Sequence, residues 1–220
     1  MILDHQDGTT VGMKLSGGAD SSIIYYAFCE KYKNNDSVNI VVITLDTDLK
    51  FHYVANATRI IEKVAELTGK RPLKHFTNRI PHGWREYTAG QEDLVKQAQS
   101  EFGDMKFYSG MTTNPNIDDM KEYFLNNDFG LNYTKVLDTI ASRDVERDEL
   151  HGLNRGYRPF GNSDKRAVSH AYNDLNALDI IYTHTNSCES VTMVGDDGIP
   201  IHCGHCWNCL ERWYAFGRIL

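Results

Sequence analysis

The sequence has no apolar run of 18 or more residues, so no segment of it is long enough to form a transmembrane helix. Its first seven residues lack the basic stretch followed by an apolar stretch that marks a secretory leader. Internal repeats and low-complexity segments are absent as well. We therefore expect a cytoplasmic protein that has no membrane partner.

Basic residues are also in short supply. The chain has 23 Lys and Arg residues against 30 Asp and Glu residues, a formal net charge of −7. Nonspecific nucleic-acid binding depends on neutralising phosphates with basic side chains, so this balance argues against a nucleic-acid partner. The mean hydropathy of −0.47 argues against an integral membrane protein. A local basic site for a small anionic ligand stays compatible with both values.

What the sequence does contain is enough chain, 220 residues, for one domain with a sizeable core. Strands and helices are expected to alternate in its first third, with strands at 11–15, 39–45 and 73–76 and helices at 21–32 and 53–67. Farther along we expect a helix at 89–102, a strand at 106–111 and a helix at 164–178. The stretch 118–157 is polar and weakly periodic. Alternating strands and helices predict an α/β fold with a Rossmann-like parallel sheet.

A glycine pair follows the first expected strand, in the stretch Ser16-Gly17-Gly18-Ala19-Asp20-Ser21. Glycines let the backbone adopt a positive φ and approach a ligand closely. Consecutive amides at a helix N-terminus form an anion site, to which the serine hydroxyls add donors. The stretch is not a Walker A motif, because no Gly-Lys-Ser/Thr follows. The alternative is a strand–helix turn in which the glycines only allow the backbone to turn and bind no ligand.

Cysteine is scarce and clustered. Four of the five cysteines, Cys188, Cys203, Cys206 and Cys209, crowd the end of the chain with the spacing C-x14-C-x2-C-x2-C. Such turns bring thiolates onto one ion, and four sulfurs complete the tetrahedron of a structural zinc site. A histidine (202 or 205) in place of one sulfur, or an iron–sulfur cluster on three cysteines, are alternatives. The isolated Cys29 is expected to be a buried, small apolar residue.

Two further groups have weaker patterns. Trp84, Arg85 and Tyr87 could form a surface on which a base stacks, although ordinary packing is the usual role of such residues. Four arginines, at 143, 147, 155 and 158, form the one locally basic run. That run could bind an anionic substrate or a partner, but the acidic residues between the arginines favour a surface of ion pairs.

Both motifs resemble those of a known family. Ser-Gly-Gly-x-Asp-Ser after the first strand resembles the pyrophosphate loop of the PP-loop (N-type) ATP pyrophosphatases, which share the adenine nucleotide alpha hydrolase-like fold. The tail, from Cys188 through the Cys203–Arg212 stretch to Phe216, looks like the zinc-binding tail of the 7-cyano-7-deazaguanine synthases within that superfamily. Pro159-Phe160 and Asp164-Lys165-Arg166 resemble the segment that precedes this tail.

The resemblance implies roles for individual residues. In the family the loop holds the β and γ phosphates of ATP, and the end of the second strand lies at the adenosine. The implied nucleotide-binding residues are Ser16, Gly17, Gly18, Asp20, Ser21, Thr44, Leu45 and Asp46. Lys165 would approach the phosphates, with Arg166 as the alternative, so that Asp20, Ser21 and Lys165 form the implied catalytic group. Mg²⁺ is the expected partner of the phosphates, and Zn²⁺ the expected ion at the four cysteines.

The resemblance also implies an activity: an ATP-dependent ligase that releases AMP and pyrophosphate while converting 7-carboxy-7-deazaguanine and ammonia to 7-cyano-7-deazaguanine, a step of queuosine biosynthesis. The family's usual substrate segments are not matched, since Asp46-Thr47-Asp48 replaces Tyr-Gly-Gln and residues 109–116 lack Tyr-Pro-Asp. Two alternatives follow. One is a PP-loop enzyme with another acceptor, such as one for tRNA or nucleotide sulfur transfer. The other is a catalytically silent nucleotide-binding module whose zinc tail docks a partner.

The two motif blocks suggest an organisation for the chain. Residues 1–180 are expected to form the ATP-binding α/β domain. Residues 181–220 are expected to form a small zinc-binding segment packed on that same domain. A homodimer is compatible with these expectations.

Overall fold

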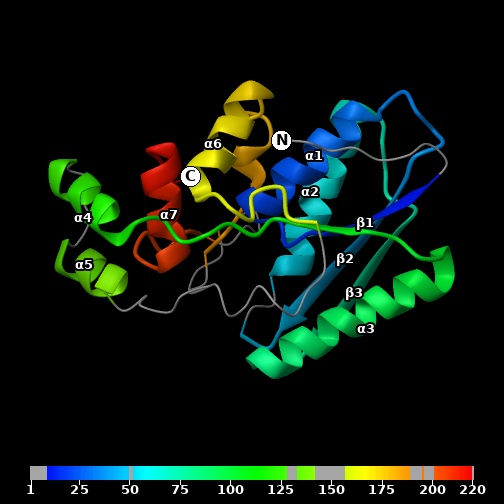
Figure 1. The fold of residues 1–220 in the computed structure, drawn as a ribbon, viewed down its shortest axis with the longest axis horizontal. Helices are drawn as coiled ribbons and strands as arrows, with labels where there is room; N and C mark the ends of the chain where they lie inside the picture. The colour runs from blue at the N-terminus through cyan, green and yellow to red at the C-terminus, as the bar shows by residue number, and fades with distance from the viewer. Residues whose placement is uncertain are drawn as a thin grey trace.

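The computed structural model describes residues 9–49, 52–127, 133–141, 157–188, 195 and 201–219. Four strands in these residues form one sheet, in the order β3-β2-β1-β4, and every neighbouring pair is parallel. The strands are β1 (Thr10–Lys14), β2 (Asn39–Thr47), β3 (Lys74–Ile80) and β4 (Phe107–Ser109). The sheet confirms the predicted α/β fold (Figure 1).

Helices cover both faces of the sheet. The helices α1 (Ala19–Lys31) and α2 (Tyr53–Thr68) pack on one face, and α3 (Trp84–Phe102) packs on the other (Figure 1). Side chains alternate between faces along a strand. Met13 of β1 therefore lies in the core cluster of α1, while Ile43 of β2 lies in the cluster of α3. β2 needs both covers, because all of its residues after the first are buried.

Several boundaries differ from those expected. β3 continues to Ile80, because its last residues pair with the end of β2. α1 begins at Ala19 and thus takes in part of the glycine loop. α3 begins at Trp84, five residues before the expected start, directly after the N-cap residue Gly83. α2 ends at Thr68, one residue past the expected end, where Gly69 closes the helix with a φ of 73° in the left-handed region.

The second half of the described chain is helical. Its elements are α4 (Ile117–Asn126), α5 (Tyr133–Ala141), α6 (Lys165–Asp174), the short 3-10 helix η2 (Tyr182–His184) and α7 (Trp207–Phe216). The helices α4, α5 and α7 lie beside one another and share a third hydrophobic cluster (Figure 1). The expected zinc-binding segment ends in a helix, because α7 begins directly after its N-cap residue Cys206 and contains Cys209. The predicted helix 164–178 ends earlier, at Asp174.

In the described part of the chain, no helix is both long and apolar enough to span a membrane. The division into residues 1–180 and 181–220 stays a prediction. The helix α7 of the second segment contacts α6 of the first, and it also contacts α4 and α5.

Candidate functional site

The glycine loop lies at the carboxyl end of β1 and runs directly into α1. Gly18 is the N-cap residue of α1, and no side chain caps that end of the helix. Gly17 has a φ of 74°, and a Cβ atom added there would come within 2.4 Å of the Asn56 Cβ atom of α2. Only glycine fits this position, because a side chain would be strained by its backbone and would collide with α2.

Backbone amides and hydroxyls converge at this loop. The Ser16 amide donates to the Ser21 hydroxyl over 3.3 Å, and the Gly18 amide donates to the Ser16 hydroxyl over 3.4 Å. The Ala19 amide donates to the Ser187 hydroxyl over 3.2 Å, which ties the loop to the C-terminal part of the chain. The positive end of the α1 helix dipole also lies at this loop, which suits an anion.

A cavity of about 380 Å³ opens in front of this turn. Its volume lies in the range of small-molecule and cofactor sites. The predicted residues that line it are Ser16, Gly18, Asp20, Ser21, Thr44, Leu45 and Lys165. Gly17 and Asp46 do not line it. The structure thus brings most of the predicted nucleotide and catalytic residues to one cavity.

Asp46 instead serves the start of α2. Its Oδ1 atom accepts the Val54 amide over 3.0 Å. Burial raises the pKa of the Asp46 carboxyl, while the hydrogen bonds from the backbone of Val54 and Tyr53 work against that rise. This carboxylate therefore satisfies an amide of the first turn of α2, in the manner of a capping residue.

Thr44 of β2 contacts Leu15, which follows β1, and His75 of β3. Its hydroxyl donates to the Leu15 carbonyl over 2.5 Å and contacts the His75 Nε2 atom over 2.8 Å. Because the hydroxyl proton is directed to Leu15, His75 is the donor in the second bond. Burial lowers the pKa of His75 to about 4, so the ring is neutral at pH 7.

Lys165 is the first residue of α6 and reaches the loop from there. Its side chain is buried: the residue is 4% exposed, and its Nζ atom lies 3.2 Å from the Asp20 Oδ2 atom and 3.5 Å from the Glu211 Oε2 atom. Arg166, the alternative in the sequence, is bound instead to Asp164, with an Nη2 to Oδ2 distance of 2.6 Å, and does not line the cavity. The structure therefore places Lys165, and not Arg166, at the loop.

Two buried charged residues of α7 were not predicted to take part. Glu211 and Arg212 are both 0% exposed. The Arg212 Nη1 atom donates to the Thr185 hydroxyl over 2.9 Å and to the Ser187 hydroxyl over 3.3 Å. Its guanidinium lies 4.1 Å from the centroid of the Tyr182 ring. A Glu-Arg pair beside the buried Leu210 was the available signal, but only the packing of α7 shows where the two charges go.

The cavity also holds cationic residues that the sequence did not assign to it. Lys14 and Arg158 both line it, together with Gln91 of α3. The Lys14 Nζ atom donates to the Gln91 Oε1 atom over 3.2 Å. Burial, helped by the positive charge of Arg158 and opposed by Glu92, lowers the pKa of Lys14 to about 8. The other three arginines of the basic run, at 143, 147 and 155, lie outside the described residues.

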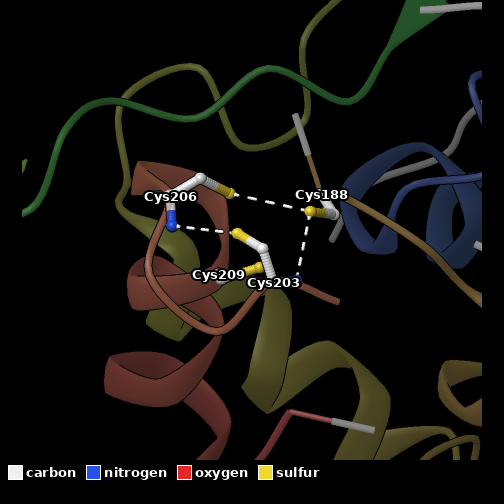
Figure 2. Close-up of side chains that lie close together, drawn as sticks. All are labelled: Cys188, Cys203, Cys206 and Cys209. Atoms are coloured by element: carbon white, nitrogen blue, oxygen red, sulfur yellow. Dashed lines mark hydrogen bonds between the residues drawn. The ribbon is translucent and has the colours of Figure 1, made fainter. Parts of the chain in front are cut away.

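The four predicted cysteine ligands come together (Figure 2). The Sγ atoms of Cys188, Cys203, Cys206 and Cys209 all lie within 4.8 Å of one another, so this sulfur group can bind a metal ion. The Cys206 amide donates to the Cys203 sulfur over 3.2 Å, and the intervening Gly204 turns with a φ of 76°. The hydrogen bond from Cys206, with burial, raises the pKa of the Cys188 thiol to about 12. A bound cation would lower this thiol pKa again, because it favours the thiolate form.

The two histidines that were alternatives to a sulfur lie outside this group of four. The His205 Nδ1 atom contacts the Cys203 carbonyl oxygen over 2.8 Å. The His202 Nδ1 atom lies 3.6 Å from the Cys209 sulfur, and burial, with the charge of Arg212, lowers the pKa of His202 to about 4. Cys29 is fully buried in α1, as expected, and burial raises the pKa of its thiol to about 12.

Comparison with known proteins gives a partial match. No protein-family model matches the chain. A segment of 54 residues, 24% of the chain, is 39% identical to 7-cyano-7-deazaguanine synthase of Pyrococcus furiosus and 37% identical to that of Pyrococcus abyssi. The match covers 21% of each of these curated relatives, about a fifth of their length. Over that segment the chain is similar to these two synthases.

A solved structure also resembles this chain, at a lower sequence identity. The U34-tRNA thiolase NcsA from Methanococcus maripaludis, solved with its [4Fe-4S] cluster, aligns with a TM-score of 0.44 and 14% sequence identity. The alignment covers 78% of this chain and 59% of that chain.

Proposed function

We propose that this chain is a PP-loop enzyme that uses ATP to adenylate a carboxylic acid, and that it acts as a 7-cyano-7-deazaguanine synthase. The observation that carries the proposal is the meeting of the Ser16–Ser21 loop and Lys165 at one cavity. The sequence match to two such synthases supports the choice of reaction. The acceptor would be 7-carboxy-7-deazaguanine, with ammonia as the nitrogen source.

The loop would bind the β and γ phosphates of ATP. The hydroxyls of Ser16 and Ser21, beside the N-terminus of α1, would supply neutral donors, and the Lys165 ammonium would supply a positive charge. Such fixed donors stabilise the charge that develops on departing pyrophosphate. Mg²⁺, when bound with ATP, neutralises phosphate charge, and the Asp20 carboxylate is the acidic group of the loop suited to hold it.

The reaction would use the nucleotide twice. A carboxylate oxygen attacks the α-phosphorus, the bond to the bridging oxygen breaks, and pyrophosphate leaves with the electron pair. Ammonia then attacks the acyl carbon, AMP leaves, and a proton is released to give the amide. The amide oxygen is adenylated by a second ATP in the same way. Loss of AMP and two protons from that adduct gives the nitrile.

We further propose that the sulfur group of Cys188, Cys203, Cys206 and Cys209 holds zinc. A zinc ion with Zn–S bonds of about 2.3 Å places its four sulfurs about 3.8 Å apart. The observed spacing, within 4.8 Å for every pair, supports a single ion. A [4Fe-4S] core stands between its cysteines and needs them farther apart. Four protein ligands leave no open position, so this zinc would stabilise the fold of the tail rather than take part in the reaction.

The test is an assay with ATP, Mg²⁺, ammonium and 7-carboxy-7-deazaguanine, followed by measurement of AMP, pyrophosphate and, by mass spectrometry, the nitrile. Asp20→Ala and Ser21→Ala are expected to abolish ATP turnover and to leave the circular dichroism spectrum unchanged. Asp93→Ala, which removes an exposed carboxylate of α3, is the matched control and should keep full turnover. Unchanged turnover in the two loop variants would refute the loop assignment.

Composition of the purified protein separates the alternatives. A colourless protein with one zinc per chain agrees with the proposal. A brown protein containing iron and sulfide, with activity on tRNA, would replace the acceptor by a sulfur-transfer substrate. ATP binding without AMP or pyrophosphate formation, whatever acid is added, would favour a nucleotide-binding module that has no activity of its own.

A further inference from the structure

A second polar region of the cavity lies on the side of α3. The side chains of Met13 and Leu15 belong to the core cluster on the α1 side of the sheet. Lys14, between them on β1, must point to the opposite face. It does so by donating to Gln91 of α3 over 3.2 Å. This region is therefore separate from the glycine loop, which leads into the N-terminus of α1.

The register of the sheet places three polar residues in one row at its carboxyl edge. Lys14 of β1 is paired with Ser109 of β4. The Ser109 amide in turn donates to the Tyr157 carbonyl over 3.0 Å, which brings the next residue, Arg158, alongside. Lys14, Ser109 and Arg158 all line the cavity. Two cations and a hydroxyl thus share one wall.

Charge indicates what this wall is suited to bind. Arg158 lies near enough to Lys14 for its positive charge to disfavour the ammonium form, in addition to the effect of burial. An anion held by both side chains offsets that repulsion, and charge-assisted hydrogen bonds to carboxylates are among the stronger ones in proteins. The guanidinium provides a planar pair of donors for a carboxylate, and the ammonium provides a compact charge.

We propose that Lys14, Ser109 and Arg158 bind the carboxylate of the acceptor acid during the first adenylation step. This inference rests on the proposed function, because it takes the acceptor to be the acid that is adenylated. In the proposed function the phosphates of ATP have their own partners in the hydroxyls of Ser16 and Ser21, the N-terminus of α1 and Lys165. The row of three residues would hold the attacking carboxylate beside them in the same cavity.

The test measures binding in the absence of turnover. Calorimetry without ATP gives the affinity for 7-carboxy-7-deazaguanine and for its neutral carboxamide, and a separate titration gives the affinity for Mg-ATP. Lys14→Met and Arg158→Met are each expected to weaken acid binding about tenfold to a hundredfold, the usual effect of losing a charged hydrogen bond. Binding of the carboxamide and of Mg-ATP should change less than about threefold.

Matched variants control for charge and folding. Lys96→Met removes an exposed lysine of α3 that is outside the cavity, and it should leave acid binding unchanged. Lys14→Arg keeps the charge and should recover much of the affinity that Lys14→Met loses. Thermal unfolding of each variant shows whether a loss of binding reflects a loss of structure.

The outcomes distinguish failure of the carboxylate subsite from failure of the proposed function. Equal acid affinity in wild type and variants would overturn the carboxylate subsite while leaving the proposed function intact. Weakening of Mg-ATP binding instead of acid binding would overturn it too, because the wall would then hold phosphate oxygens. Acid binding that depends on Lys14 and Arg158, without AMP or nitrile formation, would keep the subsite and overturn the proposed function. Acid that does not bind the wild type would overturn both.

Discussion

At the scale of single residues, Gly17 combines two constraints that can be tested apart. It has a φ of 74° and also no room for a Cβ atom, because Asn56 lies within 2.4 Å of that position. Gly69 has a similar φ of 73°, but nothing lies within 4 Å. Gly69→Ala should therefore lower the free energy of unfolding by about 1–2 kcal/mol, the cost of the left-handed conformation alone. Gly17→Ala should cost more than that.

Urea denaturation of the two alanine variants measures the difference. The excess loss in Gly17→Ala reports the displacement of α2 from the loop. Equal losses in both variants would show that Asn56 moves away freely, and the tight fit of the loop against α2 would then have no energetic weight.

His75 makes the stability of the fold depend on pH. Its pKa is about 4 in the folded chain against 6.5 for the free side chain, so the unfolded state binds more protons between these values. Stability should therefore fall as pH drops from 6.5 towards 4, by at most about 1.4 kcal/mol per pH unit from this residue. His75→Gln should flatten that part of the curve. Denaturation of both proteins from pH 4.5 to 7.5 measures it.

The exposed His170 of α6 offers the control for this comparison, since His170→Gln should leave the wild-type pH dependence in place. Loss of metal from the cysteines at low pH is common to all three proteins and cancels in the differences. A His75→Gln curve as steep as that of wild type would contradict the expectation.

The roles of residues that act together with their sequence neighbours could be predicted from the sequence. The roles of residues that act through contacts with remote elements could not. The glycine loop and the four cysteines have spacings that carry their chemistry. No such spacing marks Lys14 or Glu211, because a charged side chain becomes a site residue only when remote elements surround it. Asp46 shows the reverse case: it stands where the family places adenosine, yet it accepts an amide of α2.

At the scale of elements, α7 joins the sulfur group to the glycine loop. Cys209 and Glu211 lie two residues apart on it, and Glu211 contacts Lys165. Glu211→Gln should lower the free energy of unfolding by about 1–3 kcal/mol, because the buried Lys165 loses one of its two carboxylates. It should also weaken ATP binding, since Lys165 is held less firmly. Denaturation and an ATP titration measure the two effects.

The matched control for α7 is Glu122→Gln on α4, where the side chain is exposed. This control should change neither quantity. Metal content must be equal in all three proteins. A Glu211→Gln variant as stable as wild type would indicate that Asp20 alone satisfies Lys165.

The strength of an element's own pattern decided whether it was predicted. β2 is an almost unbroken apolar and β-branched run, so covering on both faces could be expected from its composition. α4 and α5 each bury few side chains, such as Met120 and Phe124 of α4 and Val136 and Ile140 of α5. Two apolar positions four residues apart in a polar stretch are too few to indicate a helix before the partner helix is known.

At the scale of the whole molecule, the proposed metal site and the proposed nucleotide site should be coupled. Arg212 and Glu211 extend from the last cysteine turn to Ser187 and Lys165, both at the loop. Removing the metal with a chelator that spares Mg²⁺ should therefore weaken ATP binding about tenfold, within the usual range of coupling between two sites. Calorimetric titration of the metal-free and the reloaded protein measures this change.

Coupling between binding sites is reciprocal, which supplies a second measurement. ATP should slow the transfer of metal to the chelator by stabilising the same contacts. Reloading with zinc should restore the original ATP affinity. An affinity that is the same with and without metal would show that α7 keeps its place through the hydrophobic cluster alone.

The glycine loop contacts residues that are far away in the sequence, so its contacts form late when the chain folds during synthesis. Asp20 meets Lys165 across 145 positions, and the Ala19 amide meets Ser187 across 168. All four strands of the sheet precede both partners in the chain, so during synthesis the sheet residues leave the ribosome first. Closing such long loops is slow compared with local folding. Under the proposed function, a nascent chain would thus carry a loop that cannot act on ATP until Lys165 and Ser187 have docked against it.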